Sequence, residues 1–179
     1  MKKALYIYGF NSNSNSSTKS MLNKVFNELG YEVVSVDYDQ LNPYDSLTML
    51  EKYIVDNGID LVIGSSIGAF YTLCVCEDVK KIVINPCMFP SKELPKIIKL
   101  SNDVIRHYSK LEGFLYKYND TFSIDDVMGF FGTHEELFSY YDYFKSIFPR
   151  AYKFNSAHRP TIDAFTNEVV NKIKKYINE

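Results

Sequence analysis

Short apolar runs alternate along this chain with longer amphipathic segments, and no other feature of the sequence constrains the fold as strongly. Apolar runs of four to six residues are typical of buried strands, whereas apolar residues three and four positions apart are typical of one helix face. We therefore expect strands at residues 4–8, 31–36, 59–63, 81–84, 127–131 and 151–154. We expect helices at residues 18–29, 42–56, 67–77, 137–148 and 161–177. Such strand–helix–strand units predict an α/β fold, with a mostly parallel sheet of about six strands and helices on both faces.

Residues 89–126 interrupt this alternation. The segment contains Pro90 and Pro95, two or three weakly amphipathic stretches and a polar patch at 118–120. We expect it to be a short helical insertion above the edge of the sheet, in the position of a lid. The whole chain of 179 residues has the length of a single domain with its own core, so we expect one domain over 1–179.

The segment Gly64-Ser65-Ser66-Ile67-Gly68 lies between an expected strand and an expected helix. A serine at such a turn adopts a strained backbone conformation, and its hydroxyl stands above the sheet edge. The following amide, that of Ile67, points from the helix N-terminus toward the same space and can stabilise an oxyanion. The segment predicts the nucleophile elbow of the α/β-hydrolase fold, with Ser66 as the nucleophile. Ser65 is a rival out of register with the motif, and a tight turn without chemistry is the alternative.

In this fold the catalytic acid and the histidine follow the nucleophile along the chain. His158 lies in the loop between the last expected strand and the closing helix, as a general base requires, although an ordinary loop histidine is the alternative. His107 lies in the insertion and is interpreted as a surface residue.

The acid is expected after the fifth strand, where His134, Glu135 and Glu136 occur. We favour Glu135, since a carboxylate must orient the imidazole. Glu136 or a contact from His134 are alternatives, as is a purely structural role for both glutamates in a first helical turn.

Composition and charge limit the binding partners and the cellular location that we expect for this protein. The net charge of −2 gives no broad surface for a polyanion, so nucleic acid is not expected as a partner. No segment reaches the roughly 18 apolar residues of a membrane span, and the start of the chain lacks a signal peptide's long apolar stretch. We therefore expect a cytoplasmic protein that does not bind membranes, and the sequence leaves its oligomeric state open.

The sequence also argues against a metal or a cofactor. Cys74 and Cys76 form a C-x-C pair without the flanking ligands of a zinc site, and Cys87 stands alone. We interpret all three as buried thiols. Gly9 stands alone before an Asn/Ser run, so no glycine-rich phosphate loop follows the first strand. We expect no metal site and no cofactor.

With these motifs, nearly the whole chain resembles the YqiA/YcfP-type small esterases of the α/β-hydrolase superfamily. The similarity is carried by residues 6–12, 64–70 and 156–159, together with Asn85-Pro86 after the fourth strand. The resemblance implies hydrolysis of carboxylic esters, preferably with short acyl chains, without a cofactor.

Two positions depart from the family pattern. Tyr8-Gly9-Phe10 stands where the family usually has His-Gly-Phe, and His134-Glu135 stands where it usually has an Asp-Glu pair. Gly9 and Phe10 are retained, and we expect the Phe10 amide to be the second oxyanion donor, because the loop after the first strand faces the elbow.

The function expected from the sequence is a serine hydrolase of small short-chain esters that acts through a Ser-His-acid triad and an acyl-enzyme. Two alternatives remain: a thioesterase or amidase that uses the same triad, and a catalytically weak or silent relative with a binding role.

Overall fold

The computed structural model describes residues 1–76, 78–117 and 123–179. Its centre is a six-stranded sheet in which every pair of neighbouring strands is parallel, in the order β2-β1-β3-β4-β5-β6. The strands are β1 Lys2–Ile7, β2 Tyr31–Val34, β3 Leu61–Ser65, β4 Lys80–Ile84, β5 Val127–Gly132 and β6 Arg150–Phe154. The expected parallel sheet is confirmed. The strand order reverses at β1, because β2 pairs with one edge of β1 and β3 with the other.

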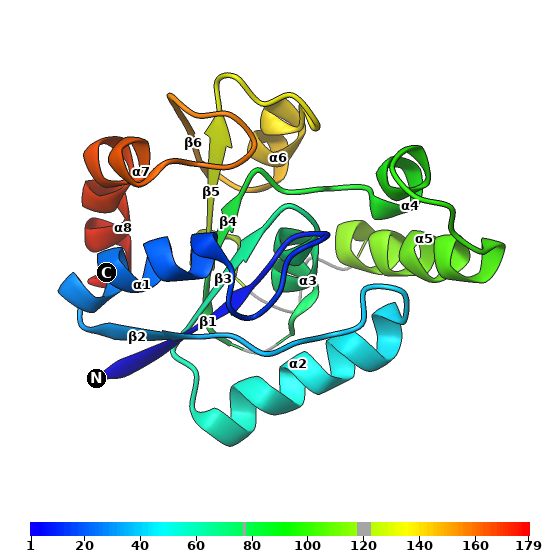
Figure 1. Cartoon of the computed structure of the whole chain (residues 1–179), viewed down its shortest axis with the longest axis horizontal. Coiled ribbons are helices and arrows are strands. Elements are labelled where there is room, and N and C mark those ends of the chain that lie inside the picture. Colours follow the sequence, from blue (N-terminus) through cyan, green and yellow to red (C-terminus); the bar gives the residue numbers. More distant parts are fainter. Residues whose placement is uncertain (77, 118–122) are drawn as a thin grey trace.

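Helices cover both faces of this sheet. They are α1 Ser17–Glu28, α2 Pro43–Asn57, α3 Ile67–Cys74, α4 Pro90–Glu93, α5 Asn102–Lys117, α6 Tyr141–Ile147, α7 Ile162–Glu168 and α8 Val170–Ile177. Figure 1 shows α1, α7 and α8 on one side of the sheet and α2, α3, α5 and α6 on the other.

Two hydrophobic cores result from the alternation of side chains along each strand. In β1, Ala4 and Tyr6 pack with α1, α7 and α8 on one face, while Leu5 and Ile7 pack with α2, α3, α5 and α6 on the other. Both faces of the inner strands are buried, which explains their nearly continuous apolar runs, whereas the edge strands β2 and β6 carry the exposed Glu32 and Lys153.

Three expected helices have different limits. The expected helix 137–148 begins only at Tyr141, because the amides of Leu137 and Phe138 donate to the Glu135 carboxylate instead of starting a helix. The closing segment 161–177 is two helices that meet at Val169. Helix α3 ends at Cys74 because the next residue is extended, and residue 77 lies outside the described residues.

Two further features differ from what the sequence suggests. Asn42 stands directly before Pro43, where its side chain could cap α2, but its side-chain amide donates to Asp45 instead. Cys76 is exposed, and only Cys74 and Cys87 are buried. Cys76 lies two residues beyond the end of α3, after the buried Val75.

The segment expected to be an insertion contains α4, the 3-10 turn η1 Leu94–Lys96, α5 and the 3-10 turn η3 Ile124–Asp126. The expected polar patch at 118–120 lies outside the described residues. Buried Glu112 of α5 accepts hydrogen bonds from the amide and the hydroxyl of Ser91, which hold α4 against α5. Over the described residues, no helix is long and apolar enough to cross a membrane.

Candidate active site

Ser66 occupies the turn between β3 and α3 with a backbone conformation of φ 55° and ψ −123°. A positive φ is unfavourable for serine, so the surrounding structure must hold it in place. The Ser66 amide donates to the Ile84 carbonyl at 3.1 Å, and the Ser66 carbonyl accepts from the amides of Ala69 at 3.2 Å and Cys87 at 3.0 Å. These bonds tie the strained turn to α3 and to the end of β4.

The two glycines of the motif are required by close packing. A Cβ atom on Gly64 would lie 2.2 Å from the hydroxyl oxygen of Thr72 and 2.6 Å from the Cα of Ala69, both in α3. A Cβ atom on Gly68 would lie 2.1 Å from the Ile7 carbonyl oxygen at the end of β1. The elbow therefore has this sequence because α3 packs directly against the backbones of β1 and β3.

Ser65, the rival serine, has a different environment. Its hydroxyl oxygen lies 2.7 Å from the hydroxyl oxygen of buried Tyr6. Burial raises the pKa of Tyr6, so this phenol stays protonated at neutral pH. The Ser65 hydroxyl is engaged in this pair, whereas the Ser66 side chain makes no capping hydrogen bond to α3.

His158 lies in the loop between β6 and α7, and Glu135 is the carboxylate that reaches its ring. The Nδ1 atom lies 2.8 Å from Oε2 and 2.9 Å from Oε1 of Glu135. The side chains of His158 and Glu135 are only 12% and 8% exposed. Glu135 itself is held by the amides of Leu137 at 2.7 Å and Phe138 at 3.2 Å. This carboxylate is therefore fixed in the orientation that a proton on Nδ1 requires.

The other candidates for the acid lie elsewhere. Glu136 is exposed and accepts the backbone amide of His158 at 3.0 Å, a bond that lowers its pKa. His134 is exposed, and its amide donates to the Ser156 carbonyl. His107 packs against the ring of Tyr44 at 4.9 Å between ring centroids, away from the other candidates. Neither glutamate lies in a helical first turn, since α6 begins at Tyr141.

Asn85 is a positioning residue that sequence reasoning missed. It follows β4, is 2% exposed and has a positive φ of 45°. Its side-chain amide donates to the carbonyls of Ala157 at 3.1 Å and His158 at 2.9 Å, and its oxygen accepts the Gly132 amide at 2.7 Å. Asn85 thus joins the ends of β4 and β5 to the histidine loop. The available signal was an Asn-Pro pair directly after a strand, since Asn tolerates a left-handed conformation.

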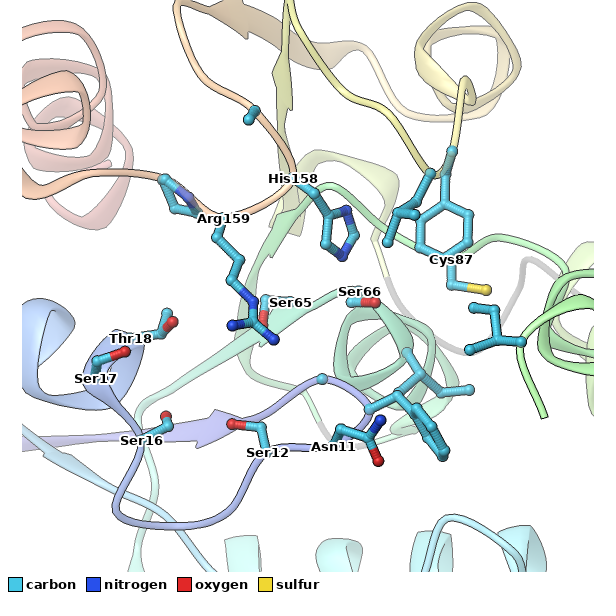
Figure 2. Close-up of a pocket in the computed structure, with 18 of the residues that line it drawn as sticks. Asn11, Ser12, Ser16, Ser17, Thr18, Ser65, Ser66, Cys87, His158 and Arg159 are labelled. Atoms are coloured by element: carbon cyan, nitrogen blue, oxygen red, sulfur yellow. The ribbon is translucent and has the colours of Figure 1, made fainter.

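Ser66 and His158 face a common cavity of about 550 Å³. The cavity lies at the carboxyl ends of β1 and β3, where the strand order reverses and where ligands bind in open parallel sheets. Figure 2 shows the imidazole of His158 pointing toward Ser66 across this space. Within the described residues no hydrogen bond joins the two side chains, and catalytic contacts of this kind often tighten only when a substrate binds.

Phe10 and Ile67, the expected oxyanion donors, also line the cavity. A Cβ atom on Gly9 would lie 3.0 Å from the Ser66 Cβ, so the loop after β1 lies directly against the elbow. In the described part of the chain, the amides of Phe10 and Ile67 donate to no other group. Both amides are therefore free to bind an oxyanion formed at Ser66.

Two chemically different kinds of side chain line the cavity. The apolar ones come from Phe10, Ile67, Leu94, Ile97, Leu137 and Phe138. Hydroxyl, amide and guanidinium side chains form a polar wall, from Asn11, Ser12, Ser16, Ser17, Thr18 and Arg159 (Figure 2). Cys87 also lines the cavity, and burial raises the pKa of its thiol, so it stays protonated. Among the described residues, no group of three His, Cys, Asp or Glu side chains could hold a metal ion.

Comparison with known proteins gives one family and several structures. The model of the uncharacterised protein family UPF0227 matches residues 3–125, which include Phe10 and the elbow but end before Glu135 and His158. Est1E from Butyrivibrio proteoclasticus has a TM-score of 0.75 at 15% identity, over 99% of this chain and 89% of that chain. Est1E with ferulic acid bound has a TM-score of 0.67 at 13% identity, over 99% and 86%. The ydeN gene product from B. subtilis has a TM-score of 0.68 at 15% identity, over 100% of both chains. At these identities the likeness shows the fold, which is that of α/β-hydrolases.

Proposed function

This chain belongs to the uncharacterised protein family UPF0227, and from its candidate site we propose that it is a serine hydrolase of small carboxylic esters. One observation carries the proposal. The strained Ser66 faces, across one cavity, a histidine whose far nitrogen is 2.8 Å from a nearly buried glutamate. A turn without chemistry would need neither the strain nor the held histidine.

The proposed reaction is acyl transfer through a covalent intermediate. The Ser66 Oγ attacks the ester carbonyl while Nε2 of His158 takes its proton, and Glu135 stabilises the resulting imidazolium through Nδ1. The amides of Ile67 and Phe10 bind the oxyanion of the tetrahedral intermediate. His158 then protonates the departing alcohol, and a water molecule that His158 activates releases the acyl group from Ser66.

The cavity favours small substrates. Its volume of about 550 Å³ lies within the roughly 300–1,000 Å³ of ordinary small-molecule sites. Among the structurally similar proteins, Est1E is known with ferulic acid bound, a distant parallel for a small-molecule ligand. We propose short-chain carboxylic esters as the substrates, with thioesters or amides as alternatives on the same triad. In this proposal the segment 89–126 acts as a lid, since Leu94 and Ile97 line the cavity.

The test compares the two adjacent serines. A fluorophosphonate probe should label the wild type and Ser65→Ala, and it should fail to label Ser66→Ala. Turnover of 4-nitrophenyl acetate by Ser66→Ala should fall by about 10⁴-fold or more, because the nucleophile is lost while the oxyanion donors remain. Full turnover by Ser66→Ala would refute the proposal. A wild type that neither takes the label nor turns over esters would favour a binding role.

A further inference from the structure

Arg159 brings a positive charge into the cavity beside the proposed nucleophile. It directly follows His158, and Figure 2 shows its side chain extending from the histidine loop into the cavity. Its charge also reaches Tyr6, because burial raises the pKa of that phenol while Arg159 acts in the opposite direction. Since Tyr6 contacts Ser65, the guanidinium lies near the elbow.

This guanidinium has no carboxylate partner within the part of the chain that the structure describes. The other two arginines do have partners, since Arg106 pairs with Asp103 and Arg150 pairs with Glu179, each at 2.6 Å. Glu136, a carboxylate that lines the cavity, accepts the backbone amide of His158 instead. An arginine fork without an ion-pair partner in a substrate-sized cavity is suited to bind a carboxylate or a phosphate.

The wall around Arg159 is polar but uncharged. It presents the hydroxyl and amide side chains of Asn11, Ser12, Asn13, Ser16, Ser17 and Thr18. Hydroxyl and amide groups can donate further hydrogen bonds to an anion. Apolar side chains, Leu94 and Phe138 among them, also line the cavity. A ligand with one anionic and one apolar end would therefore match the two kinds of lining.

We propose that the polar wall centred on Arg159 binds an anionic group of the substrate, so that the preferred ester carries a carboxylate or a phosphate on one side of the scissile carbonyl and an apolar group on the other. This inference rests on the proposed esterase function, and it adds the substrate class. The gain is moderate, because Arg159 is exposed to solvent, and we expect the anionic group to raise kcat/KM about tenfold.

The test uses esters that differ in charge but little in shape. For the acyl side, mono(4-nitrophenyl) glutarate is compared with 4-nitrophenyl 5-methylhexanoate, in which an isopropyl group replaces the carboxylate. For the alcohol side, 4-acetoxybenzoate and 4-acetoxyphenyl phosphate are each compared with methyl 4-acetoxybenzoate. These arms separate a carboxylate from a phosphate and one side of the ester from the other. At least one anionic ester should have a kcat/KM about tenfold above that of its neutral counterpart.

Two arginine variants show whether the preference comes from this wall. In Arg159→Gln the ratio of kcat/KM between anionic and neutral esters should fall to about one, and Arg159→Lys should restore part of it. Arg106→Gln, on the distant helix α5, should keep the wild-type ratio. Added salt should also lower the wild-type ratio, because the guanidinium is accessible to solvent.

Calorimetric titration of Ser66→Ala with 4-acetoxybenzoate and with its methyl ester repeats the comparison without turnover. The inference is supported if Ser66→Ala binds the anion more tightly than its methyl ester and if the double variant Ser66→Ala/Arg159→Gln loses this preference. This holds even if the wild type proves inactive and the proposed function fails. Equal or better kcat/KM and binding for the neutral esters would overturn the inference while the esterase proposal stands. An anion preference that survives Arg159→Gln would overturn it as well.

Discussion

Replacing Glu135 with glutamine should almost abolish activity, because the structure dictates which way the new amide must point. The amides of Leu137 and Phe138 both donate to Oε1 of Glu135, so the oxygen of the glutamine side chain must stay there. Its NH₂ group then takes the place of Oε2, which lies 2.8 Å from Nδ1 of His158. An NH₂ group at this distance favours donation to Nδ1 and so a ring proton on Nε2, the nitrogen that should take the proton of Ser66. The glutamine oxygen at the position of Oε1 also lies 2.9 Å from Nδ1, but it carries no negative charge to stabilise the imidazolium.

The size of the effect follows from this wrong tautomer. The corresponding Asp→Asn exchange in a serine protease triad keeps the geometry and lowers kcat about 10⁴-fold, which is about 5 kcal/mol of transition-state stabilisation. We expect a loss of similar size in kcat for Glu135→Gln, with little change in the free energy of unfolding, since the shape and the two backbone hydrogen bonds are retained.

The assay measures kcat and KM for 4-nitrophenyl acetate, with urea unfolding of each variant as a check of the fold. Glu136→Gln is the matched control, because Glu136 is exposed and accepts only the backbone amide of His158, which a glutamine oxygen can also accept. We expect less than about a tenfold loss for this control. Activity of Glu135→Gln within tenfold of the wild type, or an equal loss in Glu136→Gln, would refute the assignment of Glu135 as the acid.

Three further predictions concern the scaffold. Asn85→Ala removes three hydrogen bonds and leaves alanine at a φ of 45°. The variant should lower the free energy of unfolding in urea by about 3 kcal/mol, and it should lower kcat/KM by loosening the His158 loop. An unchanged kcat/KM would count against the positioning role of Asn85. Burial lowers the pKa of Lys81 to about 8 from 10.5, so the folded protein is penalised for holding this proton at neutral pH. Relative to Lys81→Met, which also loses the hydrogen bond from Nζ to the Val75 carbonyl, the stability of the wild type should rise by about 2 kcal/mol between pH 7 and pH 10. A stability difference in urea that does not change with pH would contradict this cause. Gly68→Ala places a Cβ 2.1 Å from a backbone oxygen of β1 and should destabilise the fold by more than about 3 kcal/mol. A Cβ on Gly113 in α5 would meet nothing within 4 Å, so Gly113→Ala should stabilise the fold by up to about 1 kcal/mol. If the urea midpoints of the two variants shifted in the same direction, the packing argument would be contradicted.

Patterns confined to neighbouring residues could be interpreted correctly from the sequence. The six parallel strands followed from apolar runs, because a strand buried on both faces needs apolar residues at every position. The elbow at Ser66 followed from the glycines on either side of it, since the close approach of α3 to β1 and β3 excludes a Cβ at those sites. Each of these features is decided by steric demands within a few residues.

Patterns that depend on contacts across the chain could not be resolved in this way. Glu135 and Glu136 are adjacent, and only the loop conformation after β5 directs the first to the ring of His158 and the second to its backbone. The same loop also explains why the expected helix 137–148 begins later. The amides of Leu137 and Phe138 donate to the Glu135 carboxylate, although the apolar spacing of the sequence predicted that they belong to the helix.

The sequence by itself determined the sheet, the elbow and the order of the candidate residues along the chain. Only the tertiary structure decided which carboxylate faces His158, that Asn85 holds the histidine loop, and that Arg159 lines the cavity without an ion-pair partner among the described residues. The physical reason is the separation of the interacting residues along the chain. Local steric constraints act between consecutive residues, whereas these hydrogen bonds and charges act between residues that come together only when the separate strands align in one sheet.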